Sequence, residues 1–322
     1  MVMIAFLFPG QGSQAVGMGR AFHAASAAAR AVFEEASDAL GLDMARLAFE
    51  GPEAELALTA NTQPAVLTVS VAAAAAAAER GLVPALAAGH SLGEYTALVV
   101  AGALRFRDAV RLVRRRGEFM QEAVPVGTGA MAAILGLELA AVEALCAEAA
   151  DGQVVEVANI NAPTQIVIAG HRPAVERAVR LAAARGGGRS VMLPVSAPFH
   201  CRLMQPAAER LRVELEAVAV ADPRLPVARN VDGELTRAAA EVRPALVRQV
   251  ASPVRWTACV ERLAAAGATA FVELGPGRVL TGLLKRILPG ARGYAVEDPA
   301  GLEQALAALA GAAPVGGGGR RG

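Results

Sequence analysis

The chain has 322 residues, enough for one large domain or two smaller ones. Hydrophobic residues make up 54% and charged residues 19%, which excludes a disordered chain, and a net charge of +1 provides no bulk attraction to nucleic acid or to an anionic membrane. The three cysteines form no Cys-x-x-Cys pair, which argues against a disulfide framework or a thiolate metal site, so we expect a reduced, cytoplasmic protein.

The first third of the chain alternates apolar runs with helical patterns. Residues 4–8 predict a buried strand, and because no basic segment precedes them they are not typical of a signal peptide. Helical patterns at residues 19–40 and 64–80 are followed by a strand at residues 84–89. The alanine-rich run at residues 69–78 is too short for a membrane span and predicts a core helix. This alternation predicts an α/β fold.

The middle of the chain predicts a separate folding unit. After a helix at residues 107–123, residues 131–195 follow the order strand, helix, strand, strand, helix, strand, which is the ferredoxin-like βαββαβ pattern. The enclosing fold then resumes with helices at residues 206–218, 254–266 and 302–310 and a strand at residues 269–274. We therefore expect an α/β-hydrolase-like large domain with a parallel sheet (residues 1–125 and 196–310), a ferredoxin-like insert (126–195) and a flexible tail (311–322).

A Gly-x-Ser-x-Gly motif extends from Gly89 to Gly93, between a short apolar strand and a helix that begins near Glu94. This context is typical of a nucleophile elbow, in which the glycines permit a sharp turn and the serine hydroxyl is exposed close to a helix N-terminus. Ser91 is therefore the candidate nucleophile. The alternative is an ordinary serine cap in a glycine-rich turn.

A serine nucleophile needs a base, and the chain has four histidines. His90 adjoins Ser91 and is expected to point away from it, while His23 and His171 belong to predicted helices or their starts. His200 lies in an irregular loop and follows Ser91 in the order of hydrolase-like folds, which makes it the candidate base, with a satisfied loop histidine as the alternative. Because no third carboxylate is evident, a backbone carbonyl is expected to orient the imidazole.

Arg116 shares one face of its predicted helix with Leu112, Val113, Phe119 and Met120. A buried guanidinium is costly unless an anion meets it, and its planar fork suits a carboxylate. Two partners remain possible, an acidic side chain of the protein or a carboxylate of the substrate. In the second case the substrate is a dicarboxylic half-thioester.

The loop after the first strand imitates part of a dinucleotide-binding fingerprint with Gly10 and Gly12. That interpretation fails, because the acidic residue that should end a second strand is replaced by Glu34 and Glu35 inside a helical stretch. The loop can instead present backbone N–H groups to an oxyanion near Ser91. A plain turn is the other possibility.

Several segments, taken together, match one family. They are FPGQGSQ (residues 8–14), GHSLGE (89–94), RRRGEFMQEA (114–123), GTGAMAAILGL (127–137), PFHCRLM (198–204), the Asn-Val-Asp turn (230–232), VRQVASPVRW (247–256) and VELGPGRVLTGLLKRI (272–287). In this order they resemble the malonyl-CoA:acyl-carrier-protein transacylases over residues 3–288.

The resemblance implies a ping-pong acyl transfer. Ser91 would take the malonyl group from coenzyme A and pass it to the phosphopantetheine thiol of acyl carrier protein, with His200 as base and then as acid. The backbone N–H groups of Gln11 and Leu92 would form the oxyanion hole. Arg116 would bind the malonyl carboxylate.

The resemblance also assigns the surroundings of these residues. The main-chain carbonyl at Gln249 would orient His200, and Phe199, Met120 and Asn161 would line the pocket. Phe199 favours malonyl groups, because its ring leaves no room for an α-methyl branch. No cofactor or metal is expected, since malonyl-CoA is a substrate. The resemblance implies a role in fatty acid biosynthesis. We expect a monomer, because no spare apolar stripe is evident, and no nucleic acid or membrane partners, because the net charge is close to zero.

Other functions remain open from the residues alone. A serine thioesterase or esterase of the α/β-hydrolase type would use the same Ser91 and His200, and an acyltransferase serving a polyketide synthase or malonate decarboxylase would share the whole site. A non-catalytic scaffold would use neither residue. Cys201 suggests a thiol mechanism only by its position next to His200, and we expect it to be structural.

Local positive surface is a candidate docking feature, because the carrier protein and coenzyme A are both anionic. The candidate residues are Arg172, Arg189, Arg278, Lys285 and Arg286. They would lie around the cleft between the large domain and the insert.

Overall fold

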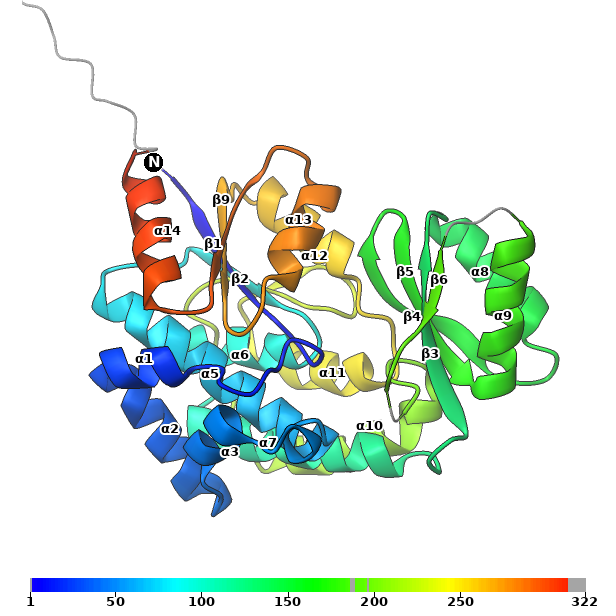
Figure 1. Ribbon diagram of the computed structural model, residues 1–322, viewed down its shortest axis with the longest axis horizontal. Coiled ribbons are helices and arrows are strands. Elements are labelled where there is room, and N and C mark those ends of the chain that lie inside the picture. Colours follow the sequence, from blue (N-terminus) through cyan, green and yellow to red (C-terminus); the bar gives the residue numbers. More distant parts are fainter. Residues whose placement is uncertain (1, 186–188, 196, 312–322) are drawn as a thin grey trace, which may run out of the picture.

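The computed structural model describes residues 2–185, 189–195 and 197–311. A larger part is built around a six-stranded sheet with helices on both faces, and a smaller part with a four-stranded sheet projects from one end of it (Figure 1). This architecture confirms the predicted α/β fold with a ferredoxin-like unit. The domain boundaries stay predictions, and Ser196 and residues 312–322, most of the predicted tail, lie outside the described residues.

The elements divide between the two parts. The strands of the larger part are β1 (Ile4–Phe8), β2 (Leu86–Gly89), β7 (Val227–Ala228), β8 (Leu235–Thr236), β9 (Ala270–Leu274) and β10 (Arg292–Val296). Its helices are α1 (Arg20–Ala25), α2 (Ala27–Leu40), α3 (Met44–Glu50), α4 (Glu53–Leu56), α5 (Thr59–Glu79), α6 (Leu92–Val100), α7 (Phe106–Glu122), the 3-10 helix η1 (Arg202–Met204), α10 (Gln205–Glu216), α11 (Ala239–Val250), α12 (Trp256–Ala265), α13 (Val279–Ile287) and α14 (Pro299–Gly311). The smaller part contains β3 (Gly129–Leu135), α8 (Leu139–Ala149), β4 (Val155–Ala162), β5 (Gln165–His171), α9 (Arg172–Ala184) and β6 (Ser190–Met192).

The large sheet brings the first strand beside the elbow strand. Its order is β10-β9-β1-β2-β7-β8, and all neighbours are parallel except the β7–β8 pair. The register pairs Phe8 with Gly89, so the loop that follows β1 and the turn that follows β2 leave the same edge of the sheet side by side. Ligands of open parallel sheets bind at this carboxyl edge.

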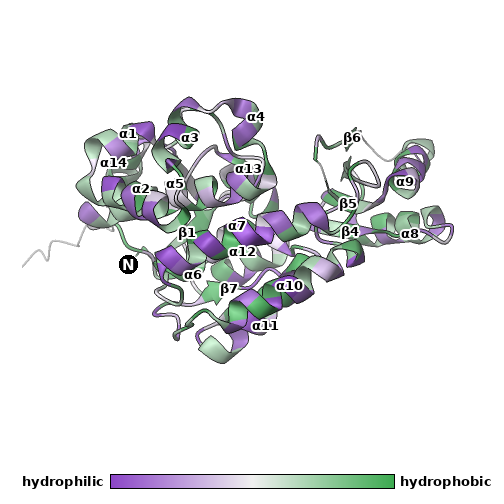
Figure 2. Cartoon of the chain, turned by 90° about the horizontal axis from the view of Figure 1, so that it is seen from below, coloured by the Kyte–Doolittle hydropathy of each residue, from purple (hydrophilic) through white to green (hydrophobic). Residues whose placement is uncertain are grey.

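Helix α5 can lie at the centre of the larger part because its own residues are mostly small or apolar on all sides. It packs against α2 and α7, and Gly117 of α7 permits the contact, since a Cβ there would lie 2.7 Å from the carbonyl oxygen of Thr59. Figure 2 shows the central strands β1 and β7 in the green of hydrophobic residues, with helices that carry hydrophilic residues around them. No helix in the described part of the chain is long and apolar enough to span a bilayer.

The small sheet has the strand order β4-β5-β3-β6, with all neighbours antiparallel, as the βαββαβ prediction requires. Strand β4 also contacts the larger part, where Ile160 N–H donates to the carbonyl of Val254, and Val254 N–H donates to that of Ala158. These bonds tie the small sheet to the segment just before α12. This junction holds in place one wall of the cavity that is described below as the candidate active site.

Some element boundaries differ from the sequence predictions. The helical run at residues 19–40 is two helices, because Ser26 adopts extended backbone and its hydroxyl accepts from Ala29 N–H as the cap of α2. The last strand of the insert ends at Met192 rather than at residue 195. Helix α11 was not predicted, and Pro244 lies inside it where a proline signals a break. The elements α3, α4, α13, β7, β8 and β10 were also missed.

Candidate active site

Ser91 lies on a turn that only close-packed glycines allow. Its backbone angles are φ 53° and ψ −108°, a strained region for a residue with a Cβ. A Cβ on Gly89 would lie 1.8 Å from the carbonyl oxygen of Gly93, and one on Gly93 would lie 2.1 Å from that of Phe8. The two glycines therefore let α6 begin directly against β1 and β2. The elbow geometry predicted from the motif is present at this turn.

His200 lies beside Ser91 although 109 residues separate them in the chain. The distance from Ser91 Oγ to His200 Nε2 is 2.8 Å, and His200 Nδ1 lies 2.9 Å from the carbonyl oxygen of Gln249. Because a carbonyl only accepts hydrogen bonds, Nδ1 carries the proton and Nε2 is free to accept from the serine hydroxyl. Burial, followed by the charge of Arg116, lowers the pKa of His200 to about 3, so the imidazole is neutral.

Arg116 reaches the same point from helix α7 and is 1% exposed. Its Nη2 donates to Gln249 Oε1 at 2.8 Å and to Ser91 Oγ at 3.1 Å, and its Nη1 donates to Gln63 Oε1 at 2.9 Å. Among the described residues, no carboxylate forms an ion pair with this guanidinium. The first alternative from the sequence, an ion pair between Arg116 and an acidic side chain of the protein, is therefore not found among these residues. Burial lowers the pKa of Arg116.

A cavity of about 520 Å³ opens over these groups. The residues that line it include Ser91, His200, Arg116, Gln11, Leu92, Phe199 and Met120. Asn161 does not line the cavity, and its Oδ1 lies 2.8 Å from Nε2 of His90, which does. Asn159, two residues earlier on β4, lines the cavity instead. Gln249 is fully buried behind the cavity.

The loop after β1 packs directly on the elbow. A Cβ on Gly10 would lie 2.5 Å from the carbonyl oxygen of His90, so this approach needs glycine. Within the described chain, no hydrogen bond uses the N–H groups of Gln11 or Leu92, although both residues line the cavity. Leu92 is the first residue of α6, where an N–H has no partner inside the helix. The two N–H groups are thus available to an anionic oxygen.

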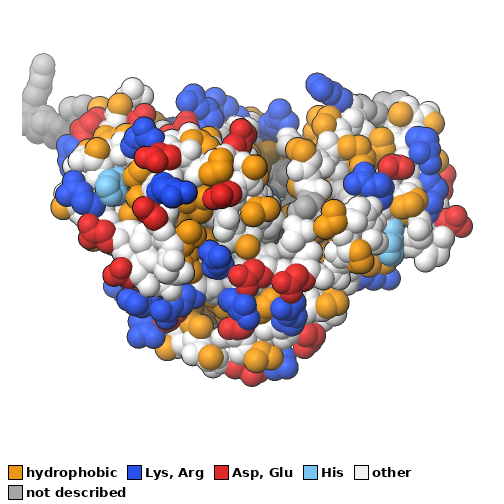
Figure 3. Space-filling view, turned by 60° about the horizontal axis from the view of Figure 1, so that its bottom comes forward, with side chains coloured by type: hydrophobic (Ala, Val, Ile, Leu, Met, Phe, Trp, Pro, Cys, Tyr) orange, Lys and Arg blue, Asp and Glu red, His pale blue; other side chains and the backbone are white. Residues whose placement is uncertain are grey.

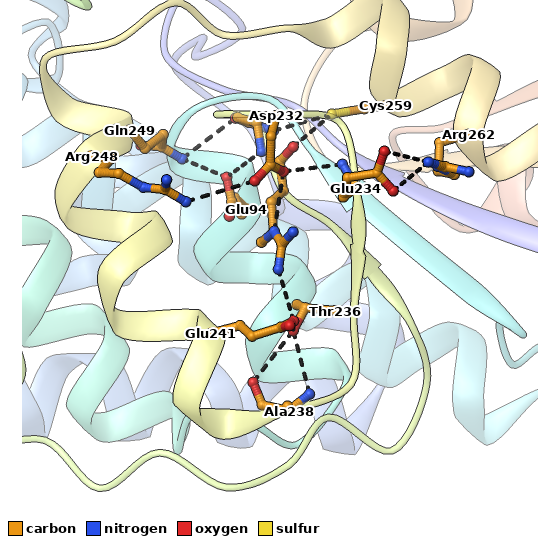
Figure 4. Close-up of polar contacts among 12 residues, drawn as sticks. Glu94, Asp232, Glu234, Thr236, Ala238, Glu241, Arg248, Gln249, Cys259 and Arg262 are labelled. Atoms are coloured by element: carbon orange, nitrogen blue, oxygen red, sulfur yellow. Dashed lines mark hydrogen bonds and ion pairs between the residues drawn. The ribbon is translucent and has the colours of Figure 1, made fainter.

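A buried polar network around Glu94 and Gln249 (Figure 4) contacts the main chain of the elbow. Glu94 Oε2 accepts from Gln249 Nε2 at 2.8 Å and from Asn230 N–H at 3.0 Å. Asn230 Oδ1 in turn accepts from Ser91 N–H at 2.7 Å. Burial raises the pKa of Glu94 to about 7, against hydrogen bonds from Asn230 and Gln249 that lower it. The side chain of Asn230 thus holds the main chain of Ser91 from below.

His23, His171 and the thiol of Cys201, next to His200 in the sequence, have structural surroundings. His23 packs edge-on against Phe33 with ring centroids 5.5 Å apart, and His171 Nδ1 accepts from a backbone N–H. Cys201 donates to the carbonyl of Pro198, and burial raises its thiol pKa to about 12. Within the described residues, no group of three or more His, Cys, Asp or Glu side chains is placed to hold a metal ion.

Three functional side chains could not be recognised from the sequence. Gln63 lies on the alanine-rich helix α5, where nothing distinguishes it from a core polar residue. Glu94 and Asn230 stand in segments that carried the family resemblance, but their contacts with the elbow depend on packing between distant segments. The only sequence signal for them was their place in those segments.

Comparisons with known proteins all point to one family. A family model described as "Acyl transferase domain" matches residues 5–305. A malonyl CoA-acyl carrier protein transacylase of Salmonella typhimurium is 52% identical over 307 residues, which cover 95% of this chain and 99% of the relative.

Solved structures have the same fold. An acyl-carrier-protein S-malonyltransferase from Burkholderia pseudomallei is 51% identical with a TM-score of 0.93, over 95% of this chain and 100% of that one. A malonyl-transacylase solved in complex with its type II PKS acyl-carrier protein is 49% identical with a TM-score of 0.93, over 95% and 99% of the two chains.

Proposed function

The chain belongs to the acyl transferase family of malonyl CoA-acyl carrier protein transacylases, and from this premise we propose the role of each site residue in its reaction. The protein transfers malonyl groups from coenzyme A to acyl carrier protein. The observation that carries the proposal is the convergence of a hydroxyl, an imidazole and a guanidinium. Ser91 Oγ lies 2.8 Å from His200 Nε2 and 3.1 Å from Arg116 Nη2, at one cavity.

Acylation begins with the hydrogen bond between the two central residues. Ser91 Oγ attacks the thioester carbonyl while His200 Nε2 takes the hydroxyl proton. The N–H groups of Gln11 and Leu92 stabilise the oxyanion of the tetrahedral intermediate. The carbon–sulfur bond then breaks, His200 returns its proton to the departing thiolate of coenzyme A, and a malonyl-serine ester remains.

Deacylation repeats these steps with a different thiol. His200 removes the proton of the carrier protein's phosphopantetheine thiol, and the sulfur attacks the ester of Ser91. Collapse of the intermediate forms the new thioester and returns the proton to Ser91 Oγ. The Gln249 carbonyl holds Nδ1–H throughout, which supports the orientation of the ring but leaves no carboxylate to stabilise the imidazolium.

Arg116 binds the malonyl carboxylate. Its guanidinium contacts neutral amide oxygens from Gln63 and Gln249, so a substrate carboxylate brings the missing negative charge. Phe199 and Met120 line the same cavity. We assign to the ring of Phe199 the exclusion of an α-methyl branch. Together these residues support selectivity for malonyl over larger or uncharged acyl groups. Asn161 acts through His90 rather than as part of the pocket wall.

Intact mass measurement tests these roles. Mixing the protein with malonyl-CoA should add the mass of one malonyl group, and adding acyl carrier protein should remove it. The Ser91→Ala variant should gain no mass. Arg116→Ala should lose malonyl loading by roughly two to three orders of magnitude more than acetyl loading from acetyl-CoA, because only the malonyl group has a carboxylate for the guanidinium to bind. Equal losses for both thioesters would overturn the role of Arg116.

We also propose a docking surface for the anionic carrier protein. Figure 3 shows a hollow between the larger and the smaller part, with Lys and Arg side chains on both of its sides. The exposed candidates are Arg172, Arg189, Arg278, Lys285 and Arg286. Reversing the charges of Lys285 and Arg286 should raise KM for the carrier protein without changing acyl-enzyme formation. An unchanged KM would remove this surface from consideration.

The setting of the reaction is a further part of the proposal. We place the protein in the cytoplasm, in fatty acid biosynthesis and as a monomer, acting without nucleic acid or membrane partners. Its three cysteines are free and buried, which suits a reducing compartment. Sedimentation of the purified protein in the presence and absence of carrier protein tests the monomer.

A further inference from the structure

Glu94 is a buried carboxylate that does not line the substrate cavity. It lies in the first turn of α6, three residues after Ser91, and is 2% exposed. A single oxygen, Oε2, accepts from both Asn230 N–H and Gln249 Nε2 (Figure 4). Burying a carboxylate is costly, so the two residues that it binds show what it does for the site.

Those two residues hold the main chain of Ser91 on both sides. Asn230 Oδ1 accepts from Ser91 N–H at 2.7 Å, and Asn230 Nδ2 donates to the carbonyl of Gly89 at 2.8 Å. Gln249 Nε2 donates to the carbonyl of Ser91 at 3.0 Å. The strained turn is therefore clamped at its N–H and at its C=O, and Glu94 holds both halves of the clamp.

The side-chain amide of Gln249 has one productive orientation. Its Oε1 accepts from Arg116 Nη2 at 2.8 Å, while its Nε2 faces oxygen atoms of Glu94, Ser91 and Asn230 at 2.8, 3.0 and 3.4 Å. An amide turned by 180° would set an NH₂ group against the guanidinium and an oxygen against these acceptors. Glu94 is the nearest of the three acceptors. It therefore contributes most to keeping Oε1 on Arg116.

We propose that Glu94 is a positioning residue for malonyl recognition, acting through the amide of Gln249 on Arg116. This inference rests on the proposed role of Arg116 as the carboxylate-binding residue. What Glu94 supplies is an acceptor oxygen at one point, and Gln supplies the same oxygen without the charge. Leucine has a similar shape and supplies none, so it leaves Asn230 N–H and Gln249 Nε2 without their partner.

The test compares enzyme acylation by malonyl-CoA and by acetyl-CoA in four variants. Glu94→Leu should lower the malonyl-to-acetyl ratio of kcat/KM on the order of tenfold, the effect of leaving a buried donor without its acceptor. Glu94→Gln should recover most of that ratio. Gln249→Leu should lower it as Glu94→Leu does, and the double variant should be no worse than Gln249→Leu alone, because the two residues act in one chain of contacts.

Glu273 offers a matched control. It is also a fully buried carboxylate, but it accepts from the N–H groups of Leu280 and Thr281 at the start of α13. Glu273→Leu should leave the ratio unchanged although it removes a buried acceptor in the same way as Glu94→Leu, which separates malonyl recognition from a general loss of stability. Unfolding of every variant is followed by the fluorescence of Trp256, the single and fully buried tryptophan.

Several results would overturn the inference. One is a malonyl-to-acetyl ratio in folded Glu94→Leu that equals the wild-type ratio. A second is a fall of this ratio in the double variant that equals the combined falls of the two single variants. A third is a tenfold fall of the ratio in Glu94→Gln. If Glu94→Leu does not fold, an unchanged ratio in Gln249→Leu overturns it equally. A failure of the proposed function itself gives a different result, because Arg116→Ala would then keep its malonyl-to-acetyl ratio.

Discussion

Replacing Glu94 by Gln should stabilise the protein at alkaline pH, because it removes a carboxyl group that the folded state holds at an unfavourable pKa. Burial raises the pKa of Glu94 from 4.5 to about 7, while hydrogen bonds from Asn230 and Gln249 and the charge of Arg116 act in the opposite direction. The Gln side chain keeps an acceptor oxygen for the two donors and does not titrate. The difference between wild type and variant therefore isolates this single group.

The sign and size of the effect follow from proton linkage. Below pH 4.5 the carboxyl is protonated in both the folded and the unfolded states, so its titration does not lower the free energy of unfolding. Between pH 4.5 and 7 the unfolded chain releases this proton while the folded protein keeps it, and the free energy of unfolding falls as pH rises. Above pH 7 the full cost is present, about 3 kcal/mol, and most of it develops between pH 5 and pH 8.

Urea unfolding at pH 5 and pH 8, followed by the fluorescence of Trp256, measures this difference. Between pH 5 and pH 8, Glu94→Gln should gain about 2–3 kcal/mol in the free energy of unfolding relative to wild type. Glu50→Gln changes an exposed carboxylate and should show no such gain. An advantage of Glu94→Gln that is the same at both pH values would refute the reasoning, because it would show that the buried carboxyl does not hold its proton.

Three further predictions concern the residues around the cavity. Ser91→Gly should abolish acylation but raise the free energy of unfolding by about 1–2 kcal/mol, because glycine adopts φ 53° and ψ −108° without strain. Urea unfolding measures this, and a variant less stable than wild type would contradict it. Phe199→Ala should raise methylmalonyl loading at least about tenfold relative to malonyl loading, since the space for one branch opens, and intact mass after mixing with both thioesters measures it. The low pKa of His200 predicts that the rate of single-turnover acylation by acetyl-CoA does not change from pH 8 to pH 5, because the imidazole stays neutral throughout. A fall in this rate centred near pH 6.5 would argue against the prediction.

The sequence predicts the elbow well because its determinants are local. The strand, the glycines and the helix start of α6 lie within one short segment, and steric clashes at Gly89 and Gly93 enforce the turn whatever the rest of the chain does. The loop after β1 is predicted less directly. Its place beside the elbow depends on the parallel register between Phe8 and Gly89, which hydrophobic patterns do not specify.

The supporting residues are harder to predict, since their roles depend on contacts between distant segments. A glutamate in the first turn of a helix is favourable in an exposed position, so the place of Glu94 gives no sign that it is buried. The sequence identifies Asn230 only as part of a turn. Its hydrogen bond with Ser91 N–H joins two distant segments and is seen only in the structure. The carbonyl of Gln249 was expected from the family resemblance, and its side-chain contact with Arg116 emerges only in three dimensions.

The arrangement of the site also explains why so much polar structure lies beneath one hydroxyl group. Ser91 and His200 both have positive φ, at 53° and 61°, and each such residue costs on the order of 1–3 kcal/mol. Such backbone persists only where several contacts hold it. Asn230 supplies a contact to Ser91, and Gln249 supplies contacts to both Ser91 and His200. Because these contacts are made before substrate binds, the hydroxyl, the imidazole and the guanidinium need little reorganisation during the reaction. The buried carboxylate of Glu94 is thus a stability cost that the fold accepts in return for a rigid turn at the point of acyl transfer.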